Sequence, residues 1–266
     1  MAADMPGIDK EAEAFLLGRV ALVTGSARRT GAALVHAMAA AGASVIVNAK
    51  TSHAEALALA GDINARHGAG RAQVCMADIT DENAVRSMMQ AIAASHGRLD
   101  ILVNNAVVRR HGALESFSLA DWRTVMESTL DGAFLCAKHA APLLAASGAG
   151  RIINLSGVAS HVPATGGAAV AAAKAGLEGL TRALAHELGP QHITVNCICP
   201  GVMLADGDPP QRAIDLRAYC EPEKLPIARF GHIDETVAAV LSLCSAPFAF
   251  MTGQVIHLNG GLHYGG

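Results

Sequence analysis

The chain has 266 residues, 52% of them hydrophobic, which is enough to bury the core of one α/β domain of ordinary size. Its formal net charge is −3 and only 16% of its residues are charged, so nucleic acid and anionic membranes are not expected partners. No run of about 20 apolar residues predicts a membrane span. The acidic first residues also lack the basic and apolar regions of a secretion signal, which favours a cytoplasmic protein.

Cysteine and histidine spacing gives no pattern typical of a metal site. None of the six cysteines forms a C-x-x-C pair, and the twelve histidines show no H-x-x-x-H spacing. Cys197 and Cys199 lie two apart on a predicted strand and therefore share a face, so a metal pair is the less favoured alternative there. We interpret the cysteines as buried free thiols and expect no metal.

Short apolar runs alternate with longer helical patterns after an N-terminal arm over residues 1–17, which predicts one domain over residues 18–266. Strands are expected at 20–24, 44–48, 73–77, 101–104, 151–155, 193–198 and 255–258. Helices are expected at 30–41, 53–67, 81–96, 120–146, 166–188 and 234–245. Wholly apolar strands separated by helices indicate a parallel sheet covered on both faces, that is, a doubly wound sheet of the Rossmann type. A proline-containing segment at about 202–228 breaks this alternation and is expected to be a substrate-side loop.

The first predicted strand runs into T-G-S-A-R-R-T-G at residues 24–31, which opens a helix. This resembles the T-G-x-x-x-G-x-G motif of the short-chain dehydrogenase/reductase family, with Arg29 at the middle glycine as in its pteridine reductase branch. Two further motifs match: N-N-A-G, here ending in Val107, and N-x-x-x-P-G at residues 196–201, beyond which Ala205 replaces a threonine. The resemblance covers residues 19–262 and implies a seven-stranded sheet.

The resemblance also implies a bound nicotinamide dinucleotide. An NAD site places an acid at the end of the second strand, whereas this chain has Lys50, Thr51 and Ser52 there, with Arg28 in the glycine loop. These groups favour NADP(H) over NAD(H), although Lys50 by itself reads as a solvated surface charge. The cofactor-binding residues expected are Gly25, Ser26, Arg28, Arg29, Thr30, Gly31, Lys50, Thr51, Ser52, Asp78, Ile79, Asn104, Ala106, Lys174, Pro200 and Gly201.

The family reduces a carbonyl with a tyrosine as general acid, assisted by a lysine, a serine and an asparagine. Lys174 matches the lysine, but Val170 stands four residues before it, where the tyrosine belongs. Gly157 stands at the serine position, thirteen residues earlier, and Thr129 at the asparagine position. Three of the four catalytic positions are therefore replaced, which predicts an atypical active site.

Three functions remain open. In the first, the chain is an NADP(H)-binding oxidoreductase of unknown substrate in which another residue donates the proton. His161 is the favoured donor because its ordinary pKa lies near neutrality. The other candidates are Arg109, Arg110, His111, Tyr219 and Tyr264. In the second, Lys174 is the base of a non-redox lyase or isomerase. In the third, the chain is a pseudoenzyme that binds NADP(H) or another small ligand without catalysis.

The resemblance implies a homodimer or homotetramer, because the helices that correspond to 120–146 and 166–188 pair across a twofold axis in the family. Small residues at Ala141, Ala172, Ala173 and Ala183 would allow close approach of two chains. The alternative is that these alanines only pack within their own chain.

Overall fold

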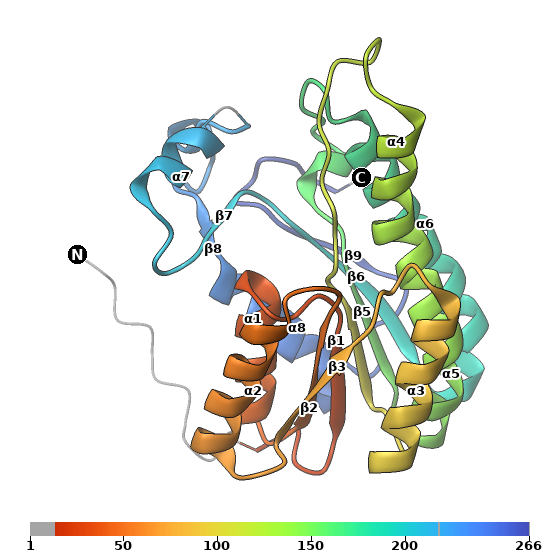
Figure 1. Cartoon of the computed structure of the whole chain (residues 1–266). Helices are drawn as coiled ribbons and strands as arrows, with labels where there is room; N and C mark the ends of the chain where they lie inside the picture. Colours follow the sequence, from red (N-terminus) through yellow and green to blue (C-terminus); the bar gives the residue numbers. More distant parts are fainter. Residues whose placement is uncertain (1–13, 218, 266) are drawn as a thin grey trace.

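A computed structural model describes residues 14–217 and 219–265, and its centre is a sheet of seven parallel strands (Figure 1). The strands are β1 (Val20–Val23), β2 (Ser44–Ala49), β3 (Ala72–Met76), β4 (Ile101–Asn104), β5 (Arg151–Leu155), β6 (Thr194–Pro200) and β9 (Val255–Leu258). Their order is β3-β2-β1-β4-β5-β6-β9, so the chain winds outward from β1 in one direction and then from β4 in the other. This confirms the doubly wound α/β sheet.

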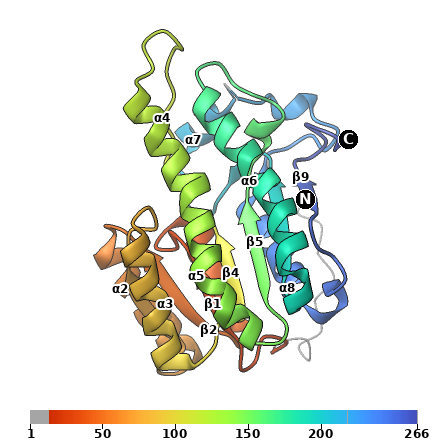
Figure 2. The same cartoon turned by 90° about the vertical axis from the view of Figure 1, so that its right-hand side faces the viewer.

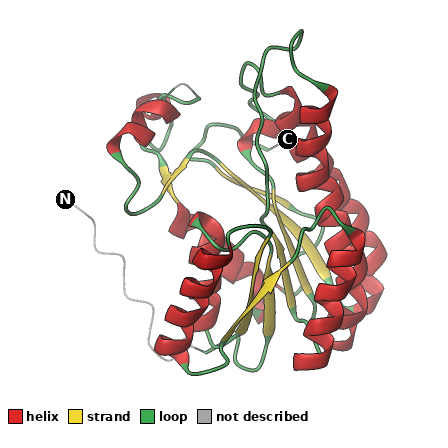
Figure 3. Cartoon of the chain, in the orientation of Figure 1, coloured by secondary structure: helices red, strands yellow, loops and turns green. Residues whose placement is uncertain are grey.

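Helices cover both faces of the sheet (Figure 3). One layer contains α1 (Arg29–Ala40), α2 (His53–His67) and α8 (Ile233–Cys244). The other contains α3 (Glu82–His96), α5 (Gly132–Ala146) and α6 (Ala168–Leu188). Two apolar cores result, one between each helix layer and the sheet. Strands β1, β4 and β5 are buried along their whole length, which explains why they read as continuous apolar runs.

The expected helix over 120–146 contains a change of helical winding. It runs as α4 (Leu119–Met126), a π-helical turn (Glu127–Asp131) and then α5. Figure 2 shows α4 and α5 as one long element beside α6. Single π turns inside α-helices occur frequently at functional sites, and this one contains Thr129.

The segment over 202–228 has more structure than the predicted loop. It contains α7 (Pro210–Leu216), and β7 (Met203–Leu204) pairs in parallel with β8 (Gly231–His232) in a separate small sheet. In Figure 1 these elements stand beyond the carboxyl ends of the main strands, opposite α4. They therefore form one wall over the edge of the sheet where an active site is expected.

The predicted boundary between arm and domain differs from the structure. Residues 1–13 lie outside the described residues. Leu16, however, is fully buried, and its backbone N–H donates to the carbonyl of Ala41 at 2.9 Å. The domain therefore begins before residue 18, because this leucine packs in the core between the sheet and the layer of α1, α2 and α8.

Candidate active site

Side chains from neighbouring strands hold the loop that follows β1. Asn105 donates through Nδ2 to the carbonyl of Thr24 (2.8 Å), and Asn48 Oδ1 accepts the N–H of Gly25 (3.1 Å). The hydroxyl of Thr24 accepts from the backbone N–H of Asn105 at 3.0 Å. The loop is thus fixed by polar groups at the ends of β2 and β4.

Two glycines of this loop cannot carry a side chain. The φ of Gly25 is 59°, and a Cβ there would lie 2.9 Å from the Cβ of Ala106. A Cβ at Gly31 would lie 2.6 Å from the Cα of Ser26. The loop therefore has no side chains at these two positions, just before and within the N-terminus of α1. This arrangement favours bound phosphate groups.

Arg29, at the position of the family's middle glycine, has the left-handed φ of 51° and pairs with Asp208. Both guanidinium nitrogens contact the carboxylate, with Nη2 3.1 Å from Oδ2. This hydrogen bonding holds the pKa of Asp208 at about 2. Arg212 Nε lies 3.4 Å from the same carboxylate. The ion pair therefore joins the glycine loop to the wall formed by residues 205–216.

The cations at the end of β2 have carboxylate neighbours. Lys50 Nζ lies 2.6 Å from Asp78 Oδ2. Although burial acts in the opposite direction, the hydrogen bond from Lys50 lowers the pKa of Asp78. Arg28 lies 4.0 Å from Glu55, with both side chains largely exposed. Ser52, the N-cap of α2, makes no capping hydrogen bond with its side chain, so its hydroxyl is free for a ligand.

The other expected cofactor residues lie along the same edge of the sheet. Asn104 donates to Asn154 at 2.8 Å and so joins β4 to β5. Ile79 is buried in the core between the sheet and the layer of α3, α5 and α6. A Cβ at Gly201 would lie 2.9 Å from the Cα of Asn259, and Pro200 lines the adjoining pocket. The family's motif positions therefore converge, although they come from separate parts of the chain.

A pocket of about 850 Å³ opens beside the glycine loop. Four cationic side chains line it: Arg29, Arg109, Lys174 and Arg212. Among the described residues no carboxylate lines it. Desolvation lowers the pKa of Arg109, and the charges of Arg212 and Arg29 lower it further. The pocket therefore favours a ligand that carries negative charge.

Lys174 is buried at the base of this pocket, 4% exposed, and donates from Nζ to the carbonyl of Leu155 at 2.6 Å. Desolvation by burial, assisted by the charge of Arg109, lowers its pKa to about 8. An ammonium with that pKa loses its proton near neutral pH far more readily than an exposed lysine. Lys174 therefore has the acidity of a group that transfers protons.

Two of the three replaced catalytic positions lie in the pocket with Lys174. Val170 and Gly157 line the pocket with it, and a Cβ at Gly157 would meet no atom within 4 Å. Ser156 also reaches the pocket, but its hydroxyl donates to Glu178 at 2.8 Å. Thr129 is buried in the π turn, and its hydroxyl has no hydrogen-bond partner among the described residues.

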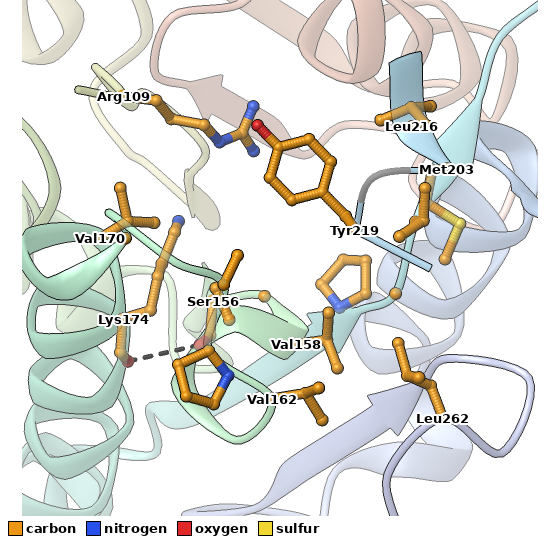
Figure 4. Close-up of a pocket in the computed structure, with 18 of the residues that line it drawn as sticks. Arg109, Ser156, Val158, Val162, Val170, Lys174, Met203, Leu216, Tyr219 and Leu262 are labelled. Carbon is orange, nitrogen blue, oxygen red and sulfur yellow. Dashed lines mark hydrogen bonds between the residues drawn. The ribbon is translucent and has the colours of Figure 1, made fainter. Parts of the chain in front are cut away.

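Three of the candidate proton donors line the pocket: Arg109, His111 and Tyr219. The rings of His111 and Tyr219 have their centroids 6.1 Å apart. Figure 4 shows the Tyr219 hydroxyl pointing toward the guanidinium of Arg109, on the wall that faces Lys174 and Val170. These groups are therefore placed to contact a ligand.

The remaining candidates lie elsewhere. His161 is not among the residues that line the pocket, and its Nε2 lies 3.1 Å from Glu178 Oε2. Arg110 lies 3.6 Å from Asp121. Tyr264 is 74% exposed and also does not line the pocket. The expectation that His161 supplies the proton consequently gains no support from its position.

Comparison with known proteins agrees with this geometry. The family described as enoyl-(acyl carrier protein) reductase matches residues 25–263. The 3-oxoacyl-[acyl-carrier-protein] reductase of Aquifex aeolicus is 35% identical over 250 residues, which is 94% of this chain and 99% of that protein. The corresponding reductase of Escherichia coli is 36% identical over 248 residues, or 92% of this chain and 98% of that protein.

The chain belongs to the short-chain dehydrogenase/reductase family. Among solved structures of this family, one described as a short-chain alcohol dehydrogenase from Sinorhizobium meliloti superposes with a TM-score of 0.84 at 34% identity. The match covers 92% of this chain and 96% of that one. Fold and oxidoreductase family are thus established together, as the glycine motif predicts.

Within this short-chain dehydrogenase/reductase, the sequence gives no sign of Arg212, which lines the pocket, or of Asp208, which pairs with Arg29 and Arg212. They lie in the segment that breaks the strand–helix alternation, where no motif of the family reaches. The sequence offered one indication of such a pair: the excess of cationic residues near the glycine loop predicts an acidic partner, but it does not identify that residue.

None of the helices in the described part of the chain has the length and apolar character to cross a membrane.

Proposed function

We propose that this protein is an NADP(H)-dependent carbonyl reductase acting on a 3-oxo compound, with Lys174 in place of the family's tyrosine as proton donor. The observation that carries the proposal is the buried Lys174, with a pKa of about 8, at the base of a cationic pocket beside the glycine loop. The 3-oxoacyl substrates named for the relatives supply the substrate class.

The residues present fit a dinucleotide. The bare backbone at Gly25 and Gly31, the N-terminus of α1 and Arg29 would hold the pyrophosphate. Lys50 and the free hydroxyl of Ser52 at the N-terminus of α2 would hold a 2′-phosphate, which is why we favour NADP(H). The cofactor, when bound, supplies the hydride.

The chain then has to bind the carbonyl and protonate the alkoxide. A valine at position 170 leaves space that a tyrosine ring would fill, so a substrate oxygen can approach the ammonium of Lys174 directly. Arg109 and the hydroxyl of Tyr219, on the facing wall, would orient the carbonyl and stabilise its developing negative charge (Figure 4). Lys174 gives one proton to that oxygen and regains one from solvent, so the reduction balances.

The first experiment is a calorimetric titration of the full chain with NADPH and with NADH, followed by a turnover assay with an acetoacetyl thioester. We expect tighter binding of NADPH, and oxidation of NADPH that depends on the thioester. Failure to bind either cofactor would contradict the whole proposal. Binding without turnover would contradict the catalytic part.

Two alternatives keep specific support. Val170 and Gly157 leave that side of the pocket apolar, which favours a non-catalytic protein that binds cofactor. The lowered pKa of Lys174 also suits a base in a lyase or isomerase. Hydrogen–deuterium exchange at the carbon next to the substrate carbonyl, without cofactor oxidation, would identify the second alternative.

We further propose that α5 and α6 form a contact between copies in a homodimer or homotetramer. Phe134 on α5 is 45% exposed, and Ala183 on α6 is exposed. Ala173 has to be removed from the expected contact residues, because it is fully buried inside its own chain. Its small side chain packs in the apolar cluster between α6 and α4.

A further inference from the structure

Three potential metal ligands meet behind one wall of the pocket. His161 follows the turn after β5, Cys199 lies on β6, and His257 lies on β9. One ligand atom from each residue lies within 4.8 Å of the other two. Cys199 is fully buried. The three come from distant parts of the sequence, which is why ligand spacing could not reveal them.

A third imidazole joins this group. The ring of His263, in the C-terminal segment, stacks on His161 with centroids 4.4 Å apart and planes 14° from parallel. The ring of His257 lies 4.7 Å from that of His161 and 4.9 Å from that of His263. Three imidazoles in mutual contact repel one another whenever they are protonated, so their convergence calls for a group that attracts neutral ring nitrogens.

His257 presents a polar atom that lacks a partner. Its Nδ1 is buried and makes no hydrogen bond to any described residue. On its other side the C-terminal segment approaches closely, because a Cβ at Gly265 would lie 3.2 Å from Nε2. A buried polar atom without a partner is costly, and a bound ion would satisfy it.

Glu178 orients one of the imidazoles. Its Oε1 accepts from Ser156 (2.8 Å) and Ser160 (2.6 Å), and His161 Nε2 lies 3.1 Å from Oε2. This contact engages Nε2 and leaves Nδ1 of His161 for another partner. A histidine that binds a metal through one ring nitrogen usually donates from the other nitrogen to a carboxylate, which orients the ring.

We propose that His161, Cys199 and His257 bind a zinc-type divalent cation, with His263 as the fourth ligand. Imidazole and thiolate donors select zinc over magnesium or calcium. In a tetrahedral zinc site the donor atoms lie roughly 3.5 Å apart, so small side-chain rotations would suffice for His161, Cys199 and His257, which lie within 4.8 Å of one another. The ring of His263, stacked on that of His161, would have to turn to become the fourth ligand.

The site would be structural. Val158, Val162 and Leu262 line the pocket, while their neighbours in the sequence are His161, which belongs to the metal group, and His263, whose ring contacts it. The ion would therefore fasten the C-terminal segment to the turn after β5 and fix the shape of the pocket wall. It has no part in the hydride or proton transfer proposed above, so it is tested separately from them.

The test uses the full chain without a histidine tag, stripped with a chelator, reloaded with Zn²⁺ and dialysed. We expect one zinc per chain by elemental mass spectrometry and a higher Tm than for the stripped protein. Loading with Co²⁺ should give the charge-transfer absorption of a cobalt–thiolate bond. Cys199→Ser should remove this absorption and lower zinc affinity at least about tenfold.

Cys197→Ser is the matched control, because Cys197 is equally buried on the same strand and is not part of the group. It should keep both the zinc and the cobalt absorption. His257→Gln should lose them while its circular dichroism stays native. Wild-type protein that holds no more zinc than Cys199→Ser, or a cobalt spectrum without a thiolate band, would overturn the proposal. NADPH titration of the stripped protein shows separately whether the cofactor site is intact.

Discussion

At the scale of single residues, the proposed proton transfer depends on Lys174. Burial lowers its pKa to about 8, and the family's tyrosine is absent from position 170. If the protonated lysine is the acid, the rate of carbonyl reduction should fall as pH rises through about 8, because the proton is lost there.

This pH dependence can be checked by measuring kcat between pH 6 and 10. Lys174→Met should lower kcat by about 100-fold, whereas Tyr219→Phe should leave the falling limb in place. A falling limb that disappears in Tyr219→Phe would instead identify the phenol as the donor.

Two substitutions should restore the family's usual chemistry. Gly157→Ser places a hydroxyl where a Cβ meets no atom within 4 Å, and Val170→Tyr places a phenol one helical turn before Lys174. Together they should raise reductase activity on the acetoacetyl thioester about tenfold or more, since donor and polarising group are then both present.

The two single variants are the controls for this restoration. A double variant that binds NADPH as tightly as the wild type but reacts no faster would contradict the expectation. Such a result would mean that the pocket itself has diverged from carbonyl reduction.

At the scale of elements, the Arg29–Asp208 pair makes the glycine loop and the 205–216 wall one unit. Asp208 competes with an anionic cofactor for the guanidinium. Asp208→Asn should therefore tighten NADPH binding about threefold, and Arg29→Ala should weaken it about tenfold.

Calorimetry on these variants gives the affinities. Glu223→Gln is the control, because Glu223 pairs with Arg217 in the same part of the chain and neither residue lines the pocket. Weaker NADPH binding in Asp208→Asn would mean that the pair serves the cofactor by ordering the wall.

The elements also show how far sequence alone reaches. The seven strands were predictable because buried parallel strands are apolar on both faces, and their bounds differ from the structure by at most two residues. The π turn at Glu127–Asp131 was not predictable, because its residues are equally common in an α-helix. The pairing of β7 with β8 was not predictable either, because a strand of two residues is too short to show an alternation of apolar and polar residues.

Site residues divide in the same way. Gly25, Gly31 and Lys174 follow from motifs with local spacing. The contacts of His161 with Glu178 and His257 depend on how the turn after β5 packs against α6 and β9, and no local pattern encodes that. The sequence suggested a catalytic role for His161, whereas in the structure its Nε2 contacts Glu178 and the residue does not line the pocket.

At the scale of the whole molecule, each of the two helix layers exposes a large apolar side chain to solvent. On one face of the sheet, α5 and α6 lie side by side (Figure 2). Phe134 on α5 is exposed there. On the other face, α2 presents Leu57, which is 52% exposed. If α5 and α6 form the contact between copies, a charge on α5 should separate the copies, whereas the same charge on α2 should not.

Phe134→Glu should therefore shift the protein toward monomers in size-exclusion chromatography with light scattering, since an unpaired carboxylate would be buried at the contact. Leu57→Glu, with an exposed leucine on the opposite layer, should keep the wild-type mass. An unchanged mass in Phe134→Glu would exclude α5 from the contact.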